Sequence, residues 1–445
     1  MTSTFGAAQS PSDLAPAYRG PRRRASLTIL TLLGLTACIG ATSERVAAQE
    51  PRWYRGNLHT HSLWSDGNDF PEMIADWYRS NGYHFLTLSD HNILSIGDRW
   101  IAADAPAKRG AIQAIERYRA RFGDDWVETR DREGVAQVRL KPLDEFRDRL
   151  ESPGEFLLIQ AEEITDGFGS LPIHINSTNL DEMIRPQGGA SVRATIEADL
   201  AAVDAQAARL GKPILAHLNH PNFGWGVTPV DLAAVTREHF FEIFNGHPSV
   251  NQLGDATRPD LERFWDIANT LRLVHYGGRP LYGVATDDAH HYFGGQGATA
   301  GRGWVQVRAT ELDPERLIEA MERGDFYASS GVTLRSVEWD ADRRRLTLDI
   351  EPSDGTTYVT RFVGTRRADA EAALEGFDDT AESFEFPPSI GTVLAEVEGT
   401  APAYELDGTE LYVRAIVVSS RPHPNPSWSG QVEQAWSQPF GWESR

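Results

Sequence analysis

Short apolar runs that end in polar clusters recur along most of the chain, and this pattern constrains the fold more than any other feature. The run 156–159 leads to Glu162 and Glu163, and the run 281–285 leads to Asp288. Apolar runs of this length, bounded by turn residues, are typical of buried strands, and helical patterns between them indicate parallel β/α units. In a β/α barrel the carboxyl ends of the strands meet at one mouth. We therefore expect an α/β fold that gathers these clusters at one end.

The segment that begins at Asn57, NLHTHSLWSDG, carries three side chains able to bind a metal ion. His59 and His61 are separated by one residue, so on an extended strand over residues 53–60 their side chains point the same way. Asp66 follows in the same segment. Imidazole and carboxylate groups suit zinc, manganese or iron. The same donor types recur in the later clusters, which favours one shared metal site over scattered surface histidines.

Together these motifs resemble the polymerase and histidinol phosphatase (PHP) domain. In order along the chain, the matching motifs are His59-Thr60-His61 with Ser65-Asp66-Gly67, Ser89-Asp90-His91-Asn92, Ala161-Glu162-Glu163-Ile164-Thr165, His174, His220-Pro221-Asn222 and Asp288-Ala289-His290. The resemblance covers roughly residues 53–292. It implies a distorted seven-stranded β/α (TIM-like) barrel that holds two or three divalent metal ions, zinc, manganese or iron, and acts as a metal-dependent hydrolase.

The resemblance also implies which residues hold the metals. One ion would take His59, His61, Glu163 and Asp288; a second would share Glu163 and add His174 and His220; a third would take Asp66, His91 and His290. The residues expected to be catalytic are Glu163, Asp288 and His290. A carboxylate shared between two metals suits chemistry in which paired ions clamp an oxyanion and activate water.

Three of these positions have a close neighbour of the same residue type that competes for the role. The competing pairs are His217 and His220, Glu162 and Glu163, and Asp287 and Asp288. The family motifs favour the second member of each pair, and the first is then expected to orient imidazoles from behind the ligands. Four further polar residues fit the same supporting role: Asp90, Asn219, Glu242 and Asn245.

The first 48 residues predict an export signal. Three arginines at 22–24 precede an apolar stretch, 27–39, which is the arrangement of a secretory signal and is too short for a membrane-spanning helix. Two processing sites compete. A lipoprotein-type box ends at Cys38, the only cysteine, whose lipidation would attach the protein to a membrane; an ordinary cleavage site ends at Ala48. Both predict an exported protein that is periplasmic, lipid-anchored or secreted in a bacterium.

The charge of the chain bears on its partners. The formal net charge is −21, and removing residues 1–48, with five arginines and two acidic residues, makes it −24. This charge opposes binding to nucleic acid, which depends on basic contacts with phosphates. We therefore expect a small-molecule substrate, and a PHP domain attached to a DNA polymerase is excluded.

Two domains are expected after the signal, a barrel over residues 49–334 and a β-sandwich over residues 335–445. In the barrel, helices are predicted at 71–80, 192–210 and from Asp313-Pro314 to Gly324, from proline and glycine at their ends. The charged segment 99–152 predicts a helical insertion over the barrel mouth. Near the end of the chain, short alternating runs separated by Gly, Asp and Pro predict an antiparallel sandwich. Its strands are expected at 334–339, 345–350, 358–363 and 411–419.

The function expected from these features is hydrolysis by metal-activated water, with a phosphoester as the leading substrate class. The alternative is a carbamate, ester or amide hydrolase that uses the same metals, and a third reading is a non-catalytic, metal-loaded binding protein. Basic residues around the pocket would favour phosphate, whereas an aromatic rim would favour a carbonyl substrate. Arg99 and Arg302 are the candidates for a basic rim. The candidates for an aromatic rim are Trp64, Phe223, Trp225 and Tyr292.

Overall fold

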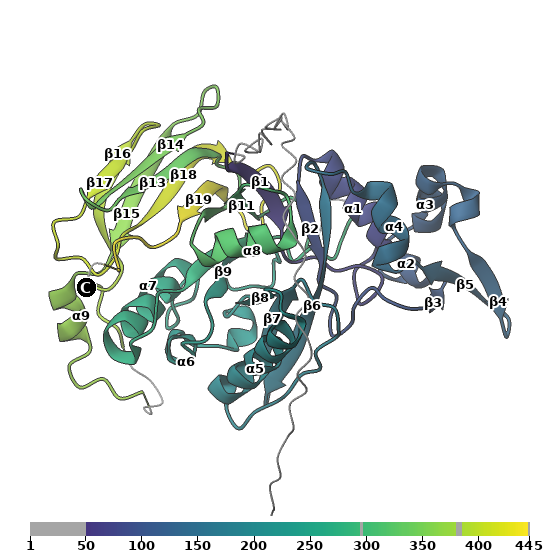
Figure 1. The fold of residues 1–445 in the computed structure, drawn as a ribbon, viewed down its shortest axis with the longest axis horizontal. Coiled ribbons are helices and arrows are strands. Elements are labelled where there is room, and N and C mark those ends of the chain that lie inside the picture. Colours follow the sequence, from purple (N-terminus) through teal and green to yellow (C-terminus); the bar gives the residue numbers. More distant parts are fainter. Residues whose placement is uncertain (1–49, 294–296, 380–384, 444–445) are drawn as a thin grey trace, which may run out of the picture. The chain divides into compact units, whose positions relative to one another are not determined.

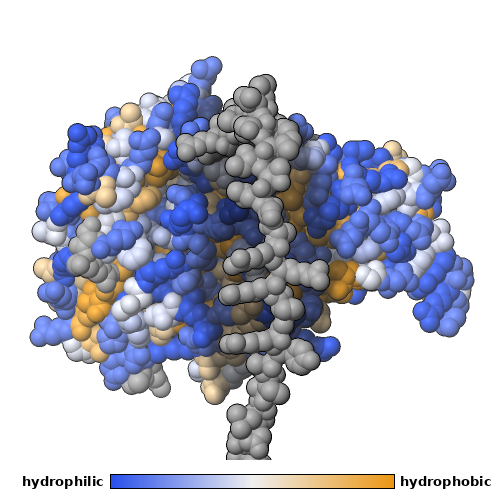
Figure 2. Space-filling model, in the orientation of Figure 1, coloured by the Kyte–Doolittle hydropathy of each residue, from blue (hydrophilic) through white to orange (hydrophobic). Residues whose placement is uncertain are grey.

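The structure, a computed structural model, describes residues 50–293, 297–379 and 385–443. The predicted signal of residues 1–48, with Cys38, lies outside these ranges. Among the helices that are described, none is long and apolar enough to span a lipid bilayer. On the face shown in Figure 2 the described surface is mainly hydrophilic, with hydrophobic residues in small scattered groups.

One large sheet runs through the molecule in the order β10-β9-β8-β7-β6-β2-β1-β11-β12-β19-β18-β15-β16 (Figure 1). Its first seven strands are β1 (Arg52–Asn57), β2 (Phe85–Leu88), β6 (Leu157–Phe168), β7 (Leu171–Thr178), β8 (Leu215–Leu218), β9 (Phe240–Asn245) and β10 (Tyr282–Thr286). Strands β2, β9 and β10 are buried along their whole length, as expected for strands covered on both faces.

These seven strands curve back on themselves without forming a regular barrel. Neighbouring strands are parallel except at β7, which is antiparallel to both β6 and β8. The two end strands, β1 and β10, meet beyond their ends through one isolated bridge between Thr60 and Ala289. The α/β class is confirmed, whereas a TIM-like barrel is not, because the parallel order is interrupted at β7 and the closure is a single bridge.

The predicted helices of this half are confirmed. They are α1 (Pro71–Ser80), α5 (Val192–Leu210) and α8 (Pro314–Glu322), and the structure adds α6 (Pro229–Ala234), α7 (Leu261–Leu271), the 3-10 turn η2 (Phe223–Trp225) and the π-helical turn η3 (Arg272–Tyr276). The side chain of Ser191 caps α5 by accepting from the backbone N–H of Ala194, and α5 ends at Gly211 with φ 68°. The side chain of Asp313 caps α8 in the same way.

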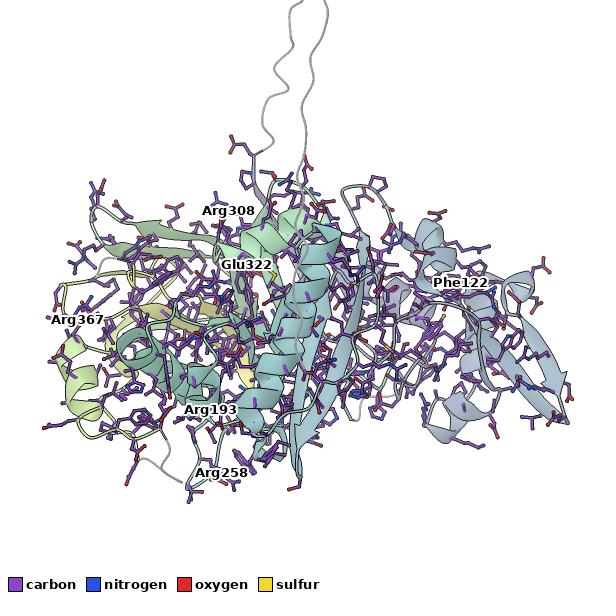
Figure 3. The ribbon with its side chains drawn as sticks, turned by 60° about the horizontal axis from the view of Figure 1, so that its bottom comes forward. Phe122, Arg193, Arg258, Arg308, Glu322 and Arg367 are labelled. Carbon is purple, nitrogen blue, oxygen red and sulfur yellow. The ribbon has the colours of Figure 1, made fainter. Side chains whose placement is uncertain are left out.

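The segment 99–152 forms an insertion between β2 and β6, which lies at one side in Figure 1 and contains the labelled Phe122 in Figure 3. Its elements are β3 (Arg99–Ala102), α2 (Ala105–Lys108), α3 (Ala114–Phe122), the 3-10 turn η1 (Asp124–Trp126), β4 (Thr129–Arg132), β5 (Val135–Leu140) and α4 (Leu143–Leu150). The prediction of a helical insertion was wrong in part, because β3, β5 and β4 form an antiparallel sheet. The buried Val138 and Leu140 of β5 pack against Leu63 and Trp64, in the loop that follows His61.

The C-terminal part is a two-layered β-structure that shares the large sheet. The sheet continues through β11 (Trp304–Ala309), β12 (Phe326–Ser329), β19 (Val432–Ser437), β18 (Arg414–Pro422), β15 (Tyr358–Gly364) and β16 (Thr392–Glu398). The second layer contains β13 (Leu334–Asp340), β14 (Arg345–Ile350) and β17 (Ala403–Glu405), and helix α9 (Arg367–Ala373) lies after β15. Leu346, Leu348, Phe362 and Val417 belong to the core between the layers. The predicted strands are confirmed, with β18 beginning three residues later than expected.

Candidate metal centre

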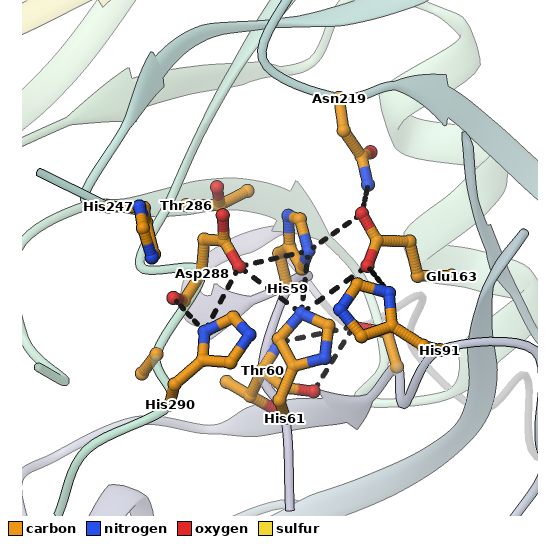
Figure 4. Close-up of polar contacts among 12 residues, drawn as sticks. His59, Thr60, His61, His91, Glu163, Asn219, His247, Thr286, Asp288 and His290 are labelled. Atoms are coloured by element: carbon orange, nitrogen blue, oxygen red, sulfur yellow. Dashed lines mark hydrogen bonds and ion pairs between the residues drawn. The ribbon is translucent and has the colours of Figure 1, made fainter. Parts of the chain in front are cut away.

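The structure brings all nine predicted ligand residues together, and Figure 4 shows His59, His61, His91, Glu163, Asp288 and His290 among them. We call them the donor cluster: His59, His61, Asp66, His91, Glu163, His174, His220, Asp288 and His290. His59 and His61 lie just beyond β1, and His91 lies beyond β2. Glu163 lies within β6, where its backbone forms a bridge with His91. The convergence of strand ends that the sequence pattern predicted is therefore present in the fold.

The first donor group contains His59, His61, Glu163 and Asp288. The two imidazole Nε2 atoms of His59 and His61 lie 3.1 Å apart, and Oδ1 of Asp288 lies 3.3 and 3.2 Å from them. The two oxygens of Glu163 lie 3.4 Å from Nε2 of His59 and 3.5 Å from Nε2 of His61. Two ligand atoms that are each about 2.1 Å from a zinc ion, at tetrahedral angles, lie about 3.4 Å apart. The spacing of these donors therefore fits one shared cation.

Protonation of the histidines also suits a cation. Nδ1 of His59 donates to Oε1 of Glu242 at 2.7 Å, which leaves a lone pair on Nε2 when the ring is neutral. Burial and the neighbouring His290 lower the pKa of His61 to about 3, so its imidazole is neutral. Burial alone would lower the pKa of His59, but Asp288, Glu242 and Glu163 raise it well above its usual range. The carboxylates thus favour positive charge at this point.

The second group is organised by the carboxylate of Glu163. Its Oε1 lies 2.9 Å from Nδ1 of His174 and 3.5 Å from Nε2 of His220, and its Oε2 lies 2.6 Å from Nδ1 of His91. Burial alone would raise the pKa of Glu163, but His91, His174 and His59 hold it well below its usual range. Glu163 is therefore ionised and lies between donors of the first and second groups, as a bridging carboxylate must.

The third group is centred on Asp66. Its Oδ1 lies 3.3 Å from Nε2 of His290 and 3.6 Å from Nδ1 of His61, and its Oδ2 lies 3.5 Å from Nε2 of His91. The Asp66 side chain is 54% exposed, whereas those of Glu163 and Asp288 are 1% and 6% exposed. The donor cluster is therefore open to solvent on the Asp66 side, which is where a small molecule can approach it.

Four supporting residues hold the donor cluster in place; Glu242 orients an imidazole, as predicted, whereas Asn219, Asn245 and Asp90 bond to carboxylates or to the loop that carries Asp66. Glu242 accepts from His59 and from the backbone N–H of His220, at 2.7 Å each. Asn219 donates to Oε1 of Glu163 at 2.8 Å, and Asn245 donates to Oδ2 of Asp288 at 3.1 Å. The fourth, Asp90, accepts from the backbone N–H and hydroxyl groups of both Ser62 and Ser65 and so orders the loop that carries Asp66.

Two of the competing neighbours have a role different from the one expected. Glu162 accepts from the backbone N–H of Ile184, and burial raises its pKa to about 8. Asp287 accepts from the hydroxyl of Tyr78 and from backbone N–H groups of residues 301–303. The prediction that these two orient imidazoles was wrong, because within the described ranges their hydrogen bonds go to backbone and tyrosine donors. His217 is buried with Nε2 3.6 Å from Oε1 of Glu242, the carboxylate that holds His59.

The backbone at the donor cluster is strained. His220 has φ 21° and Asp288 has φ 48°, in the left-handed region that L-residues rarely adopt. Such strain persists only where surrounding contacts impose it, and it is common at functional sites. Gly67 is constrained by close packing, because a Cβ at this position would lie 2.3 Å from the carbonyl oxygen of His61.

Among the proposed rim residues, Phe223 is the one beside the donor cluster, with ring centroids 5.1 Å from His220 and 6.1 Å from His174. Trp64 is buried in the loop that follows His61. The hydroxyl of Tyr292 donates to the backbone carbonyls of His61 and Ala289. Arg302 is 4% exposed and donates to the carbonyl of Gly246.

Trp225 and Arg99 are engaged with other side chains. The guanidinium of Arg258 lies 3.8 Å from the ring centroid of Trp225, and that of Arg99 lies 5.7 Å from the ring centroid of Trp64. Sequence reasoning gave no role to His247, whose ring centroid lies 5.5 Å from that of His290. The signal that could have assigned it is its position just beyond β9, at the same kind of strand end that located the other clusters.

Comparison with known proteins gives distant structural neighbours. No protein-family model matches the chain, and no curated protein matches it. A two-domain protein from Bacteroides vulgatus, described as containing a predicted PHP-like metal-dependent phosphoesterase, is 14% identical with a TM-score of 0.38, covering 87% of this chain and 95% of that chain. A proposed metal-dependent phosphoesterase from Bifidobacterium adolescentis is 13% identical with a TM-score of 0.29, covering 56% of this chain and 93% of that chain. At these identities and TM-scores, function has to be inferred from the donor cluster itself.

Proposed function

We propose that this protein is a metal-dependent hydrolase of the PHP type and that it acts on phosphoesters. The observation that carries this proposal is the position of Glu163. Its two carboxylate oxygens lie within 3.5 Å of imidazole nitrogens from His59, His61 and His174, so one carboxylate joins two donor groups. This arrangement suits two neighbouring cations better than one. Divalent ions bound there would supply Lewis acidity and an activated water.

The residues of the chain would hold and orient the reacting groups. Glu242 fixes the His59 ring, Asn219 fixes Glu163, and Asn245 fixes Asp288, each through a hydrogen bond to the group itself. Partners of this kind set the direction of a ligand and raise its basicity. Because Glu163 and Asp288 are buried and Asp66 is exposed, chemistry would take place on the side next to Asp66.

The charge of the donors favours an anionic substrate. The donor cluster contains three carboxylates, Asp66, Glu163 and Asp288, and Glu242 adds a fourth behind His59. The remaining donors are imidazoles, which are neutral when they bind a metal. Three divalent cations would carry six positive charges, two more than these four carboxylates balance, whereas two cations would leave no surplus. The surplus would attract a phosphate group without help from arginine or lysine.

Hydrolysis of a carbamate, ester or amide is the second candidate, and a specific observation favours it. Among the described residues, no arginine or lysine forms an ion pair with the donor cluster. Arg302, the candidate for a basic rim, donates to the backbone carbonyl of Gly246 instead. Phe223 provides an apolar surface beside His174 and His220 instead. These features would accept a carbonyl substrate with an apolar substituent.

A substrate panel on metal-loaded protein separates the candidates. The protein is loaded with zinc, manganese or iron and assayed with p-nitrophenyl phosphate, bis(p-nitrophenyl) phosphate, p-nitrophenyl acetate and a p-nitrophenyl carbamate. We expect turnover of a phosphoester that is lost in Glu163→Gln and kept in Glu162→Gln, the neighbouring buried carboxyl that faces Ile184. Turnover of the carbonyl substrates alone would favour the second candidate. A metal-loaded protein that hydrolyses none of these substrates would contradict both hydrolase candidates. It would favour the third hypothesis, a non-catalytic metal-loaded binding protein.

A further inference from the structure

A small cavity of about 220 Å³ lies beside the donor cluster, between the loop that follows β9 and the segment of the C-terminal part that precedes β19. The lining residues used below are Asn245, His247, Val250, Leu253, Ser427 and Trp428. Ser427 and Trp428 come from the C-terminal part, and Trp428 packs against Phe244 of β9 with ring centroids 6.0 Å apart. The C-terminal part therefore builds one wall of a cavity next to the metal centre.

Two residues connect this cavity to the donor cluster. Asn245, on its wall, donates to Oδ2 of Asp288 at 3.1 Å. His247, also on its wall, has its ring centroid 5.5 Å from that of His290, and both rings are seen together in Figure 4. A substrate whose reacting group lies at Asp288 and His290 would place its other end at this cavity.

Three further polar side chains of the cavity donate to backbone carbonyls. Ser427 donates to the carbonyl of Gly246 at 3.0 Å, and the neighbouring Gln252 donates to the carbonyl of Ile243 at 2.7 Å. The side-chain amide of Asn251 donates to the carbonyl of Asn222 at 2.8 Å. All lining residues belong to the described ranges, and none of them is Asp, Glu, Lys or Arg. The cavity thus offers few unpaired polar groups to a ligand.

Three lining side chains, Val250, Leu253 and Trp428, offer apolar surface to a ligand. Val250 and Trp428 line the cavity, and Leu253 at its edge is 63% exposed and so accessible to a ligand. An apolar cavity of about 150 Å³ is large enough to hold benzene. A cavity of about 220 Å³ therefore has room for one aromatic ring with a substituent. A ring would also stack favourably on the indole of Trp428.

His247 adds one polar group at the junction with the donor cluster. Its Nδ1 accepts from the backbone N–H of Ser249 at 3.1 Å, so the neutral ring carries its proton on Nε2. This leaves one donor able to contact an oxygen that links the reacting group to the ring in the cavity.

We infer that this cavity receives the leaving group of the substrate and selects an uncharged aromatic group. The inference rests on the proposed hydrolase function. The favoured substrate is then an aryl ester, in which the acid part binds at the donor cluster and the ring lies against Trp428. The C-terminal part would determine substrate preference without contributing to the donor cluster.

The test compares p-nitrophenyl and ethyl esters of the same phosphate on metal-loaded full-length protein. The ratio of kcat/KM for the two esters is compared between each variant and the wild type, so that the intrinsic reactivity of the leaving groups cancels. We expect this ratio to fall about tenfold in Trp428→Ala, to fall less in Leu253→Ser, and to recover in Trp428→Phe. Trp100→Ala, in the insertion, is the control and should leave the ratio unchanged. An unchanged ratio in both Trp428→Ala and Leu253→Ser would overturn the inference.

A binding measurement keeps this inference separate from the proposed function. Binding of p-nitrophenol is followed by NMR on wild type and on the same variants, and we expect weaker binding in Trp428→Ala and in Leu253→Ser, but not in Trp100→Ala. If no ester is hydrolysed, the proposed function alone is contradicted. Binding of p-nitrophenol would still test whether the cavity receives an aromatic group. Equal binding to the wild type and to all of these variants would refute the inference about the cavity. Because Leu253 is largely exposed, Leu253→Ser should fold even if Trp428→Ala does not.

Discussion

Nδ1 of His59 donates a hydrogen bond to Oε1 of Glu242 across 2.7 Å, and both side chains are fully buried. The carboxylate also accepts from the hydroxyl of Thr286 and, through its other oxygen, from the backbone N–H of His220 and the amide of Asn245. Glu242 therefore holds two members of the donor cluster at once, although it is not a member itself. The ring orientation of His59 depends on it.

Replacement of Glu242 should weaken metal binding without removing a ligand. In Glu242→Gln the side-chain NH2 group cannot accept from the donors that now face the carboxylate, so the His59 ring loses its fixed direction. We expect metal affinity to fall about 10–100-fold. Competition with a chelator measures this affinity. The control is Glu238→Gln, because Glu238 is a buried carboxyl that accepts only from backbone N–H groups of His239 and Phe240 in the described structure. Equal loss of affinity in both variants would indicate general destabilisation.

A buried ion pair couples the two halves of the molecule. Arg414 of β18 donates to Asp266 of α7 through two nitrogen atoms, at 2.6 and 2.9 Å, and the two side chains are 1% and 3% exposed. Arg414→Met leaves the Asp266 charge buried and unpaired, which we expect to lower the free energy of unfolding by about 3–5 kcal/mol. Urea denaturation measures the change. Arg316→Met removes an exposed pair with Glu319 and should have no measurable effect. A stable Arg414→Met variant would show that the halves do not depend on this pair.

Glu72 of α1 should make stability depend on pH. Burial raises its pKa from 4.5 to about 7, although the hydroxyl of Tyr118 and the indole of Trp126 donate to it. Between these two pKa values the folded protein binds a proton that the unfolded chain releases, so stability falls as the pH rises from about 4.5 to about 7. In Glu72→Gln this loss should be absent, a difference on the order of 3 kcal/mol at pH 8.

The measurement for Glu72 is the difference in free energy of unfolding between variant and wild type at pH 5 and pH 8, in which the contributions of other groups cancel. Glu116→Gln, at an exposed position of α3, is the control and should show the same difference at both pH values. A Glu72→Gln variant whose difference from wild type does not change with pH would contradict the proposed protonation of Glu72.

We propose that residues 1–48 act as an export signal, because arginines 22–24 precede the apolar stretch 27–39. Mass spectrometry of the mature protein should find either an N-terminus at Gln49 or a lipid-modified N-terminal Cys38. Substitution of Cys38 by serine should release the protein from membranes in the second case and change nothing in the first. Protein that keeps Met1 and stays in the cytoplasm would contradict both forms of the proposal.

Much of the site was predictable because it depends on local patterns. The ends of α1 follow from Pro71 and from Asn81-Gly82, and the strand ends follow from apolar runs that stop at polar residues. Because the carboxyl ends of neighbouring parallel strands lie together, those polar residues were expected to meet. Period-two alternation on β6 also separates the roles of Glu162 and Glu163, which face Ile184 and the donor cluster respectively.

Features that depend on long-range pairing were not predictable. The antiparallel direction of β7 is set by its register with β6, in which Thr165 faces His174, and no local pattern reveals it. The sheet in the insertion was missed because its strand Thr129–Arg132 is short and three of its four residues are charged. The role of Asp287, which accepts from backbone N–H groups of residues 301–303, depends on a loop distant in sequence.

The most direct test of the account is the metal content of Glu163→Gln measured beside that of Glu162→Gln. Both side chains are buried and adjacent, and both substitutions keep the shape, but only Glu163 lies among the imidazoles of His59, His61 and His174. Elemental analysis of protein loaded with zinc, manganese or iron should find two or three ions per chain in wild type and in Glu162→Gln. It should find at least two fewer in Glu163→Gln. Full metal content in Glu163→Gln, or less than about one ion per chain in wild type, would contradict a shared metal centre built on Glu163.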